Sequence, residues 1–279
     1  MSCPLGPFGP LCPFSERSFE VRILLTNDDG VYAPGLRAMR AELKKLGEVI
    51  VVAPATEQSA VGHSITLLTP LLVQEVLDDD KQFIGWAVEG RPADCVKLAL
   101  LELLTEMPDL IVSGLNAGSN AGINVLYSGT CAAAIEGAFF RRTSIAVSQE
   151  YLKPKPLDFQ RGAALARSVI EQILAHHPAD GSLFNVNIPN FDQGPVRGIR
   201  VVPQNVVPYR EMFDRRVDPR GRVYFWTKPG MICPEPMPDT DVTAVGEGYI
   251  TVTPLQFNMT RQDALADMTN WSWQLSEDK

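Results

Sequence analysis

The chain has 279 residues, of which 45% are hydrophobic and 21% charged, a composition typical of a globular protein with a substantial core. Its 25 basic and 33 acidic residues give a formal net charge of −8, which argues against a surface that binds nucleic-acid polymers. Five cysteines without a C-x-x-C pair favour a reducing cytoplasm over a disulfide framework or a zinc ribbon. With only three histidines, any bound metal is expected to be held by oxygen.

The first twenty residues are rich in proline and glycine and lack the basic start and apolar stretch of a signal peptide. We expect residues 1–20 to form a flexible N-terminal extension. No apolar stretch of the sequence is long enough to span a bilayer, so no membrane partner is expected.

From residue 21 onward, apolar runs of strand length alternate with helical patterns. Buried strands are expected at 21–27, 48–54, 109–114, 143–148 and 183–189. Helices are expected at 34–46, 92–104, 128–140 and 158–175, and two antiparallel strands around 64–75 and 83–89. This alternation predicts an α/β fold with a doubly wound, mostly parallel sheet over residues 21–195.

The pattern changes after residue 195. The segments VRGIRVVP, GRVYFW and GYITVTPL resemble strands, and 260–276 resembles a helix. We expect residues 196–279 to form a β-rich extension with a C-terminal helix used in oligomerisation; solvent-exposed loops are the alternative.

Polar, oxygen-bearing segments follow three of the predicted strands: Asn27-Asp28-Asp29-Gly30, the loop 54–59 and the loop 115–120. The carboxyl ends of parallel strands meet at one edge of a sheet. Two carboxylates, a hydroxyl and an amide carbonyl from these loops would suit a hard divalent cation. NDDG alone is better explained as a plain turn, and it is the three such loops at equivalent positions that favour metal binding.

The segment YSGT (127–130) opens a predicted helix. Ser128, the backbone N–H of Gly129 and the hydroxyl of Thr130 would face an anion at the positive end of that helix. Ordinary N-capping by a hydroxyl is the alternative. The glycine- and asparagine-rich segment GLNAGSNAG, which precedes this helix, favours the anion site, because its backbone is not covered by large side chains and lies near the start of the helix.

Other phosphate and catalytic signatures are missing. The sequence has no P-loop, no dinucleotide fingerprint, no G-x-S-x-G elbow and no cysteine followed six positions later by arginine. His63 could contact a substrate, although a surface histidine is the commoner case.

The motifs RILLTNDDGVYAPG, VVAPATEQSAVGHSITL, GRPADCVKLAL, PDLIVSGLNAGSNAG, YSGTCAAAIEG and TDVTAVGEGYITVTPL resemble the SurE family of metal-dependent nucleotidases, over about residues 21–256. The resemblance implies a Rossmann-like domain with a β-rich extension. It also implies a homodimer or homotetramer assembled partly by exchanged C-terminal segments. The implied activity is metal-dependent removal of phosphate from nucleoside 5′- and 3′-monophosphates, and sometimes from short polyphosphate.

By motif, the resemblance places the metal ligands on Asp28, Asp29, Ser59 and Asn116. It places the phosphate contacts on Asn120, Ser128, Gly129 and Thr130. One divalent ion per subunit is implied, Mg²⁺ or Mn²⁺, with Ca²⁺ able to occupy the site. The chain departs from the family pattern at Ala60, Arg91 and Gly246, which affects the expected substrate preference rather than the ligands.

We expect phosphomonoester hydrolysis by water that a bound cation activates, with Asp28 and Asp29 as catalytic residues and Asp28 as general base. One alternative is direct attack on phosphorus by Asp28, although the acid that such enzymes carry two positions later is replaced by Gly30. The other is a non-catalytic, metal-dependent module that binds or senses nucleotides.

Overall fold

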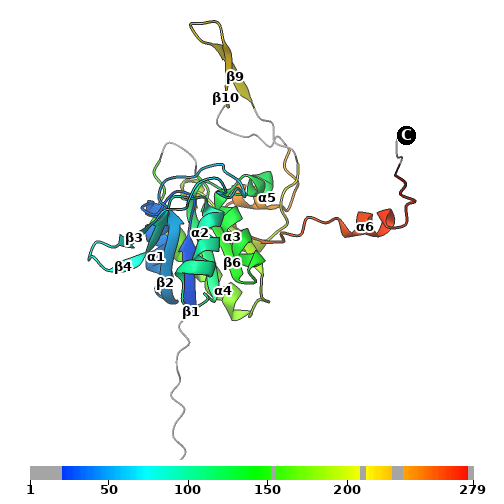
Figure 1. Cartoon of the computed structure of the whole chain (residues 1–279). Coiled ribbons are helices and arrows are strands. Elements are labelled where there is room, and N and C mark those ends of the chain that lie inside the picture. The colour runs from blue at the N-terminus through cyan, green and yellow to red at the C-terminus, as the bar shows by residue number, and fades with distance from the viewer. Residues whose placement is uncertain (1–20, 152–154, 208–211, 228–234, 276–279) are drawn as a thin grey trace, which may run out of the picture.

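A nine-stranded sheet runs through the middle of the molecule in the order β3-β4-β2-β1-β5-β6-β7-β11-β8 (Figure 1). The computed structural model describes residues 21–151, 155–207, 212–227 and 235–275; the extension predicted at 1–20 lies outside these ranges. Six neighbouring strands are parallel: Phe83–Val88 (β4), Gly47–Pro54 (β2), Val21–Thr26 (β1), Leu110–Ala117 (β5), Thr143–Gln149 (β6) and Leu183–Ile188 (β7). The predicted doubly wound, mostly parallel α/β fold is confirmed.

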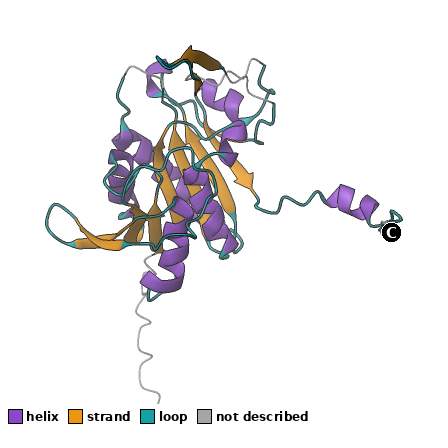
Figure 2. Cartoon of the chain, turned by 45° about the horizontal axis from the view of Figure 1, so that its top comes forward, coloured by secondary structure: helices purple, strands orange, loops and turns teal. Residues whose placement is uncertain are grey.

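Helices cover both faces of this sheet and make it a three-layer structure (Figure 2). α1 (Pro34–Leu43) and α4 (Phe159–Ala175) contact each other on one face, and α2 (Pro92–Leu98) and α3 (Gly129–Phe139) on the other. α1 and α2 begin with proline, whose fixed φ and missing N–H suit the first helical turn. None of the helices in the described ranges has the length and apolarity needed to cross a lipid bilayer.

The strand β1 shows why its sequence is an unbroken apolar run. Ile23 and Leu25 pack into the core under α1 and α4, whereas Leu24 packs into the core under α2 and α3. All three side chains are at most 1% exposed. A strand covered on both faces needs apolar residues at every position, so the alternation of a one-sided strand is absent.

The strand order reverses at β1. β2 pairs with one edge of β1 and β5 with the other, and both pairings are parallel. In open parallel sheets, the carboxyl ends of the strands on either side of such a reversal form a crevice that binds ligands. The segment that follows β1 and the last residues of β5 therefore meet at the same place.

The strand β5 is longer than predicted. It continues past 114 to Ala117, through a bulge between Ser113 and Asn116. Asn116 therefore belongs to the end of the strand rather than to the loop that follows it. A bulge bends the strand and redirects its side chains, which is how Asn116 comes to face the crevice.

Two other elements are shorter than predicted. β3 (Val73–Leu77) is antiparallel to β4 as expected, but residues 64–72 form a loop. Pro70 lies in that loop and lacks the N–H that a strand ladder uses. The predicted helix at 260–276 is reduced to α6 (Gln262–Met268), which buries none of its side chains. The helix predicted at 92–104 is present over nearly its whole predicted length, but it changes type: α2 is followed by a π-helical turn, Ala99–Leu103.

The chain after residue 195 returns to the sheet. β11 (Ile250–Leu255) is antiparallel to β7, and β8 (Ile199–Val201) pairs with the other edge of β11. Asp241, fully buried at the start of α5 (Asp241–Gly246), accepts the backbone N–H groups of Gly122 and Asn205, each at 2.8 Å. This carboxylate ties the C-terminal part of the chain to the segment between β5 and α3.

Two segments project from the body of the molecule in Figure 1: the hairpin of β9 (Phe213–Val217) and β10 (Val223–Thr227), and the arm that carries α6. Both expose large apolar side chains. Trp226 of the hairpin is 61% exposed and Trp273 of the arm is 67% exposed. Exposed apolar surface of this extent is typical of segments that contact another protein chain.

Candidate active site

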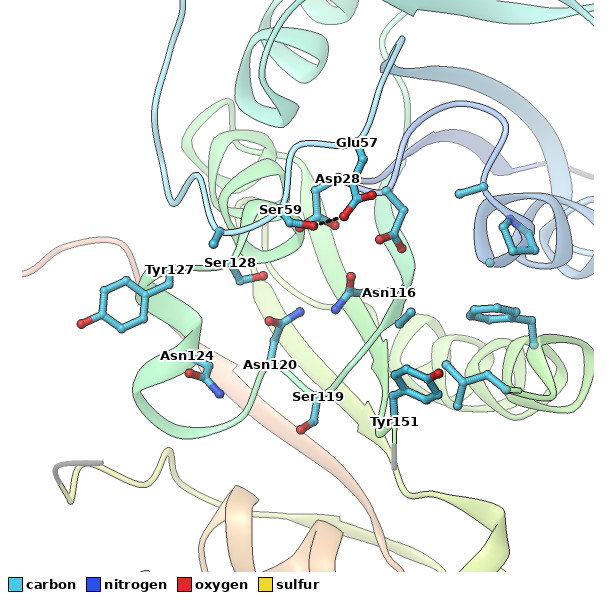
Figure 3. Close-up of a pocket in the computed structure, with 18 of the residues that line it drawn as sticks. Asp28, Glu57, Ser59, Asn116, Ser119, Asn120, Asn124, Tyr127, Ser128 and Tyr151 are labelled. Carbon is cyan, nitrogen blue, oxygen red and sulfur yellow. Dashed lines mark hydrogen bonds between the residues drawn. The ribbon is translucent and has the colours of Figure 1, made fainter. Parts of the chain in front are cut away.

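A cavity of about 750 Å³ opens where β1 and β5 end. The predicted site residues that line it come from four separate segments of the chain: Asp28, Asp29, Ser59, Asn116, Asn120 and Ser128. Figure 3 shows Asp28, Ser59, Asn116, Asn120 and Ser128 converging. The two remaining predicted residues, Gly129 and Thr130, form the start of helix α3 directly after Ser128. The strand-end loops and the helix start therefore form one site.

The segment after β1 turns sharply, and the turn directs two adjacent carboxylates to the cavity. Asn27 Nδ2 donates to the carbonyl oxygen of Gly30 at 2.9 Å. Gly30 has a φ of +98°, a conformation that residues with a Cβ rarely adopt. The backbone N–H of Gln58 donates to the carbonyl oxygen of Asp28 at 2.7 Å, which joins this turn to the loop after β2. NDDG is thus a turn that also presents its carboxylates.

Asp28 is held by the start of helix α3. Its Oδ1 accepts a hydrogen bond from the Thr130 hydroxyl at 2.5 Å, and the Thr130 backbone N–H also donates to the carboxylate. Burial nevertheless raises the pKa of Asp28, because the interior disfavours the charged form more than the Thr130 hydrogen bonds favour it. Thr130 is fully buried, so the structure places its hydroxyl on Asp28 rather than in the cavity.

Asp29 lies in a similar environment. Burial and the charge of Asp28 raise the pKa of Asp29 to about 6, although the backbone N–H of Ala117 donates to it and acts in the opposite direction. Among the described residues, no Lys, Arg or His side chain lines the cavity to offset these carboxylates. A cation between the two carboxylates would favour their charged forms and reverse both shifts.

The loop after β2 contributes Ser59 and a third carboxylate, Glu57. The Ser59 hydroxyl donates to Glu57, and both residues line the cavity (Figure 3). The charge of Glu57 adds to the effects that raise the pKa of Asp28 and of Asp29. No motif predicts a role for Glu57; its place two residues before Ser59 in an oxygen-bearing strand-end loop is the signal that could reveal it.

Two departures from the family pattern lie in or beside this loop. Ala60 has a φ of +55°, the left-handed region in which glycine is favoured and alanine is strained. Arg91 donates through Nη1 to the side chain of Gln58, the residue whose backbone holds Asp28. Arg91 therefore supports, through Gln58, the turn that carries Asp28.

Asn116 reaches the cavity from the end of β5. Its Nδ2 donates to the carbonyl oxygen of Gly118 at 2.7 Å. This hydrogen bond fixes the amide group and leaves Oδ1 as the atom available to a ligand.

Asn120 is held by buried polar side chains beneath the cavity. Its backbone N–H donates to Asn187 Oδ1 at 2.8 Å, and its carbonyl oxygen accepts from Asn185 Nδ2 at 2.7 Å. Its own Nδ2 donates to Ser148 Oγ at 2.8 Å. Asn185, Asn187 and Ser148 are each 0% exposed. Polar groups at such depth are costly unless paired, so the paired network selects one orientation of Asn120.

Asn185 and Asn187 are candidates that the motifs alone do not reveal. They alternate with Val186 and Ile188 along β7, a strand with covered faces on both sides. Asparagine is depleted in strands. Two asparagines with the two-residue spacing of one strand face are the signal that could identify them.

Helix α3 begins in close contact with Asp28. Ser128 caps the helix by accepting the backbone N–H of Cys131 at 3.0 Å, and it also lines the cavity. A Cβ at Gly129 would lie 2.8 Å from the Cβ of Asp28, closer than non-bonded carbons approach. Glycine therefore lets the positive end of the helix dipole lie against the carboxylate turn. N-capping and an anion site are both compatible with this geometry.

The residues present fit a hard divalent cation. Asp28, Asp29, Ser59 and Asn116 bring two carboxylates, a hydroxyl and an amide carbonyl to one cavity, all of them oxygen donors. In the described part of the chain, no three or more His, Cys, Asp and Glu side chains are grouped to hold a metal. The donor set thus matches Mg²⁺, Mn²⁺ or Ca²⁺ rather than zinc.

His63 does not line this cavity. Its Nε2 lies 2.8 Å from Glu136 Oε2, and Lys97 Nζ lies 3.4 Å from Glu136 Oε1. Although burial acts to raise it, the pKa of Glu136 is lowered overall by His63 and Lys97. The imidazole therefore joins the loop that carries Ser59 to helix α3.

The fold and the cavity define a doubly wound α/β protein with an oxygen-donor site at its topological switch point. The family model described as "Survival protein SurE" matches residues 23–211, which is more than half of the chain. The chain belongs to the survival protein SurE family.

Relatives that carry the name SurE support this family assignment. The chain is 53% identical over 253 residues to the 5′-nucleotidase SurE of Rhodopirellula baltica, covering 90% of this chain and 99% of the relative. It is 43% identical over 255 residues to the 5′-nucleotidase SurE of Desulforudis audaxviator, covering 90% and 97%. The crystal structure of the SurE protein from Aquifex aeolicus is similar with a TM-score of 0.76 and 35% identity, over 88% of this chain and 98% of that one.

Proposed function

We propose that this chain is a divalent-metal-dependent phosphomonoester hydrolase that releases inorganic phosphate from nucleoside 5′- and 3′-monophosphates. The names of its relatives support a 5′-nucleotidase. The observation that carries the proposal is the shared cavity, in which Asp28, Asp29, Ser59 and Asn116 lie beside Ser128 at the start of helix α3. Short polyphosphate is a further substrate under this proposal.

The first four of these residues would hold one cation per subunit, Mg²⁺ or Mn²⁺, with Ca²⁺ able to occupy the same site. When bound, a divalent cation supplies polarisation of a phosphoryl oxygen and a lowered pKa of water. The chain's own contribution is to place the phosphate. Asn120, Ser128 and the backbone N–H of Gly129 donate to its oxygens at the positive end of α3.

Asp28 is the proposed general base. Its buried carboxylate lines the cavity in which the phosphate is proposed to lie, where it can accept a proton from a water. The Thr130 hydroxyl holds Oδ1, so the other carboxylate oxygen is the one available to a water or a cation. The contribution of Thr130 to phosphate binding is thus indirect: its hydroxyl orients Asp28, and its backbone forms part of the first turn of α3.

The assembly proposed for this chain is a homodimer or homotetramer. The apolar side chains exposed on the β9–β10 hairpin and on the C-terminal arm support it, because both lie within the extension assigned to residues 196–279. We retain the division into residues 1–20, 21–195 and 196–279 as part of the proposal. A reducing cytoplasm is the proposed location; among the described residues, Cys95 and Cys131 are buried and free.

The decisive experiment measures phosphate release from AMP with Mn²⁺ or Mg²⁺, with and without a chelator. Metal-dependent release is expected, and release that survives chelation would contradict the proposed cation. Tight nucleotide binding without turnover would favour the sensing module, which the names of the relatives do not favour. A trapped phosphoenzyme that is lost in Asp28→Asn would favour direct attack by Asp28.

A further inference from the structure

The cavity has a second end whose chemistry differs from that of the carboxylate end. Tyr151, Pro156, Leu157 and Phe159 line the same cavity as Asp28. Figure 3 shows Tyr151 at the side of the cavity away from Asp28, with Asn116 between them. Tyr151 lies two residues after the end of β6 and is 39% exposed, so its ring is accessible to a ligand.

A nucleoside monophosphate has a matching asymmetry, with an anionic group at one end and a flat, largely apolar base at the other. Resting on the function proposed above, we infer that Tyr151 forms a stacking platform for the nucleobase, with Leu157 and Phe159 completing the apolar wall. The phosphate end of the substrate lies at Ser128 and the helix start, and the ribose spans the region of Asn116.

The spacing of the strands in the sheet sets the distance between the carboxylate end of the cavity and Tyr151. β6 is separated from β1 by β5 alone. Neighbouring strands lie about 4.8 Å apart, so the carboxyl ends of β1 and β6 are separated by about 10 Å. The phosphate and the base of one nucleotide, held apart by the ribose, can therefore reach both ends of the cavity at once.

The cavity has a second tyrosine, Tyr127, on its other side. In Figure 3 the ring of Tyr127 points away from Asn120 and Ser128, whereas Tyr151 lies on the opposite side of Asn120 from Tyr127. Tyr151 is therefore the platform and Tyr127 is not. A platform that reads only the face of the base gives broad base tolerance, because every base has a π-face.

The test compares Tyr151→Ala and Tyr151→Phe with AMP, UMP and ribose 5-phosphate, a substrate without a base. Tyr151→Ala is expected to lower kcat/KM for AMP and UMP by about 5- to 150-fold, the range that a stacking contact supplies. It is expected to leave ribose 5-phosphate unchanged, and Tyr151→Phe is expected to restore the nucleotides. Tyr32→Ala is the matched control, since Tyr32 is 72% exposed and lies outside the lining of the cavity.

An equal loss for AMP and ribose 5-phosphate would overturn the platform, because Tyr151 would then support the site as a whole. An unchanged AMP rate, or a loss in Tyr127→Ala instead, would also overturn it. Calorimetric titration with adenosine, which carries no phosphate, separates this inference from the proposed function. Adenosine binding that is weakened in Tyr151→Ala supports the platform even if the wild-type chain hydrolyses no monophosphate, and wild-type binding that is unaffected by Tyr151→Ala refutes it.

Discussion

The backbone N–H of Asn120 donates to Oδ1 of Asn187, which lies 2.8 Å away and 67 residues later in the chain. Asn120 belongs to the segment after β5 and Asn187 to the carboxyl end of β7, the strand that lies between β6 and β11. A residue proposed to contact phosphate is thus oriented by a fully buried side chain that never reaches the cavity.

Replacing Asn187 by alanine leaves the buried N–H of Asn120 without its acceptor, which costs about 1–3 kcal/mol of unfolding free energy. Loss of the fixed orientation is also expected to lower kcat/KM by about 10-fold or more. Thermal unfolding and steady-state kinetics measure the two effects. Asn190→Ala is the control: Asn190 is similarly buried, but its Oδ1 accepts the backbone N–H of Asp192. It is expected to lower stability alone, and equal kinetic losses in both variants would contradict a specific role for Asn187.

Thr130→Val removes the hydroxyl that donates to Asp28 while it keeps the shape of the side chain. Because this hydrogen bond lowers the pKa of Asp28, its loss raises that pKa further. The acid limb of the pH–rate profile is expected to move to higher pH, and more cation is needed for half-maximal activity at low pH. Thr130→Ser keeps the hydroxyl and serves as the control. An unchanged acid limb in Thr130→Val would show that the hydroxyl does not act on Asp28.

Gly129→Ala introduces a Cβ only 2.8 Å from the Cβ of Asp28. Helix α3 and the Asp28 turn are expected to separate by a few tenths of an ångström, with a loss of kcat/KM on the order of 10-fold or more. Gly246→Ala is a matched control in a helix, because nothing lies within 4 Å of a Cβ at Gly246. Full activity in Gly129→Ala, with wild-type stability, would mean that the close approach is not needed.

The metal-free protein is expected to lose stability as pH rises from about 4 to about 6. The folded pKa of Asp29 is about 6 against an ordinary value of 3.8, so the folded state keeps this proton to higher pH than the unfolded state. The loss amounts to about 3 kcal/mol at most. Chemical unfolding in chelator at several pH values measures it, with Asp29→Asn as the reference in which the slope is reduced to the part that Asp28 contributes. Adding Mn²⁺ is expected to stabilise the wild type at pH 7 and not Asp29→Asn.

Much of the architecture follows from local patterns in the sequence. The unbroken run Ile23-Leu24-Leu25 predicts a strand covered on both faces, and the order of strands and helices predicts a parallel sheet. Once a parallel sheet is assumed, the loops that follow its strands must share an edge, and Asp28 and Asn116 are expected together. These inferences succeed because each depends on short-range periodicity or on the geometry common to all such sheets.

Other features depend on contacts between distant residues. The bulge that keeps Asn116 within β5 leaves no distinct local pattern, and the clamp of Asn185 and Asn187 on Asn120 is a pairing across more than 60 positions. The loop 64–72 is apolar enough to resemble a strand, yet Leu68 is 99% exposed. Hydrophobic periodicity indicates which face of a helix or strand is buried, but it does not indicate which distant residues that face contacts. These details therefore cannot be predicted from it.

The position of β11 has a consequence for synthesis of the protein. This strand lies between β7 and β8, and Asp241, which precedes it in the chain, accepts the backbone N–H of Gly122 beside the candidate site. A nascent chain therefore cannot close its sheet or complete its site until residues up to Leu255 have left the ribosome. Premature termination anywhere before residue 255 would yield an unfinished protein rather than a smaller working enzyme.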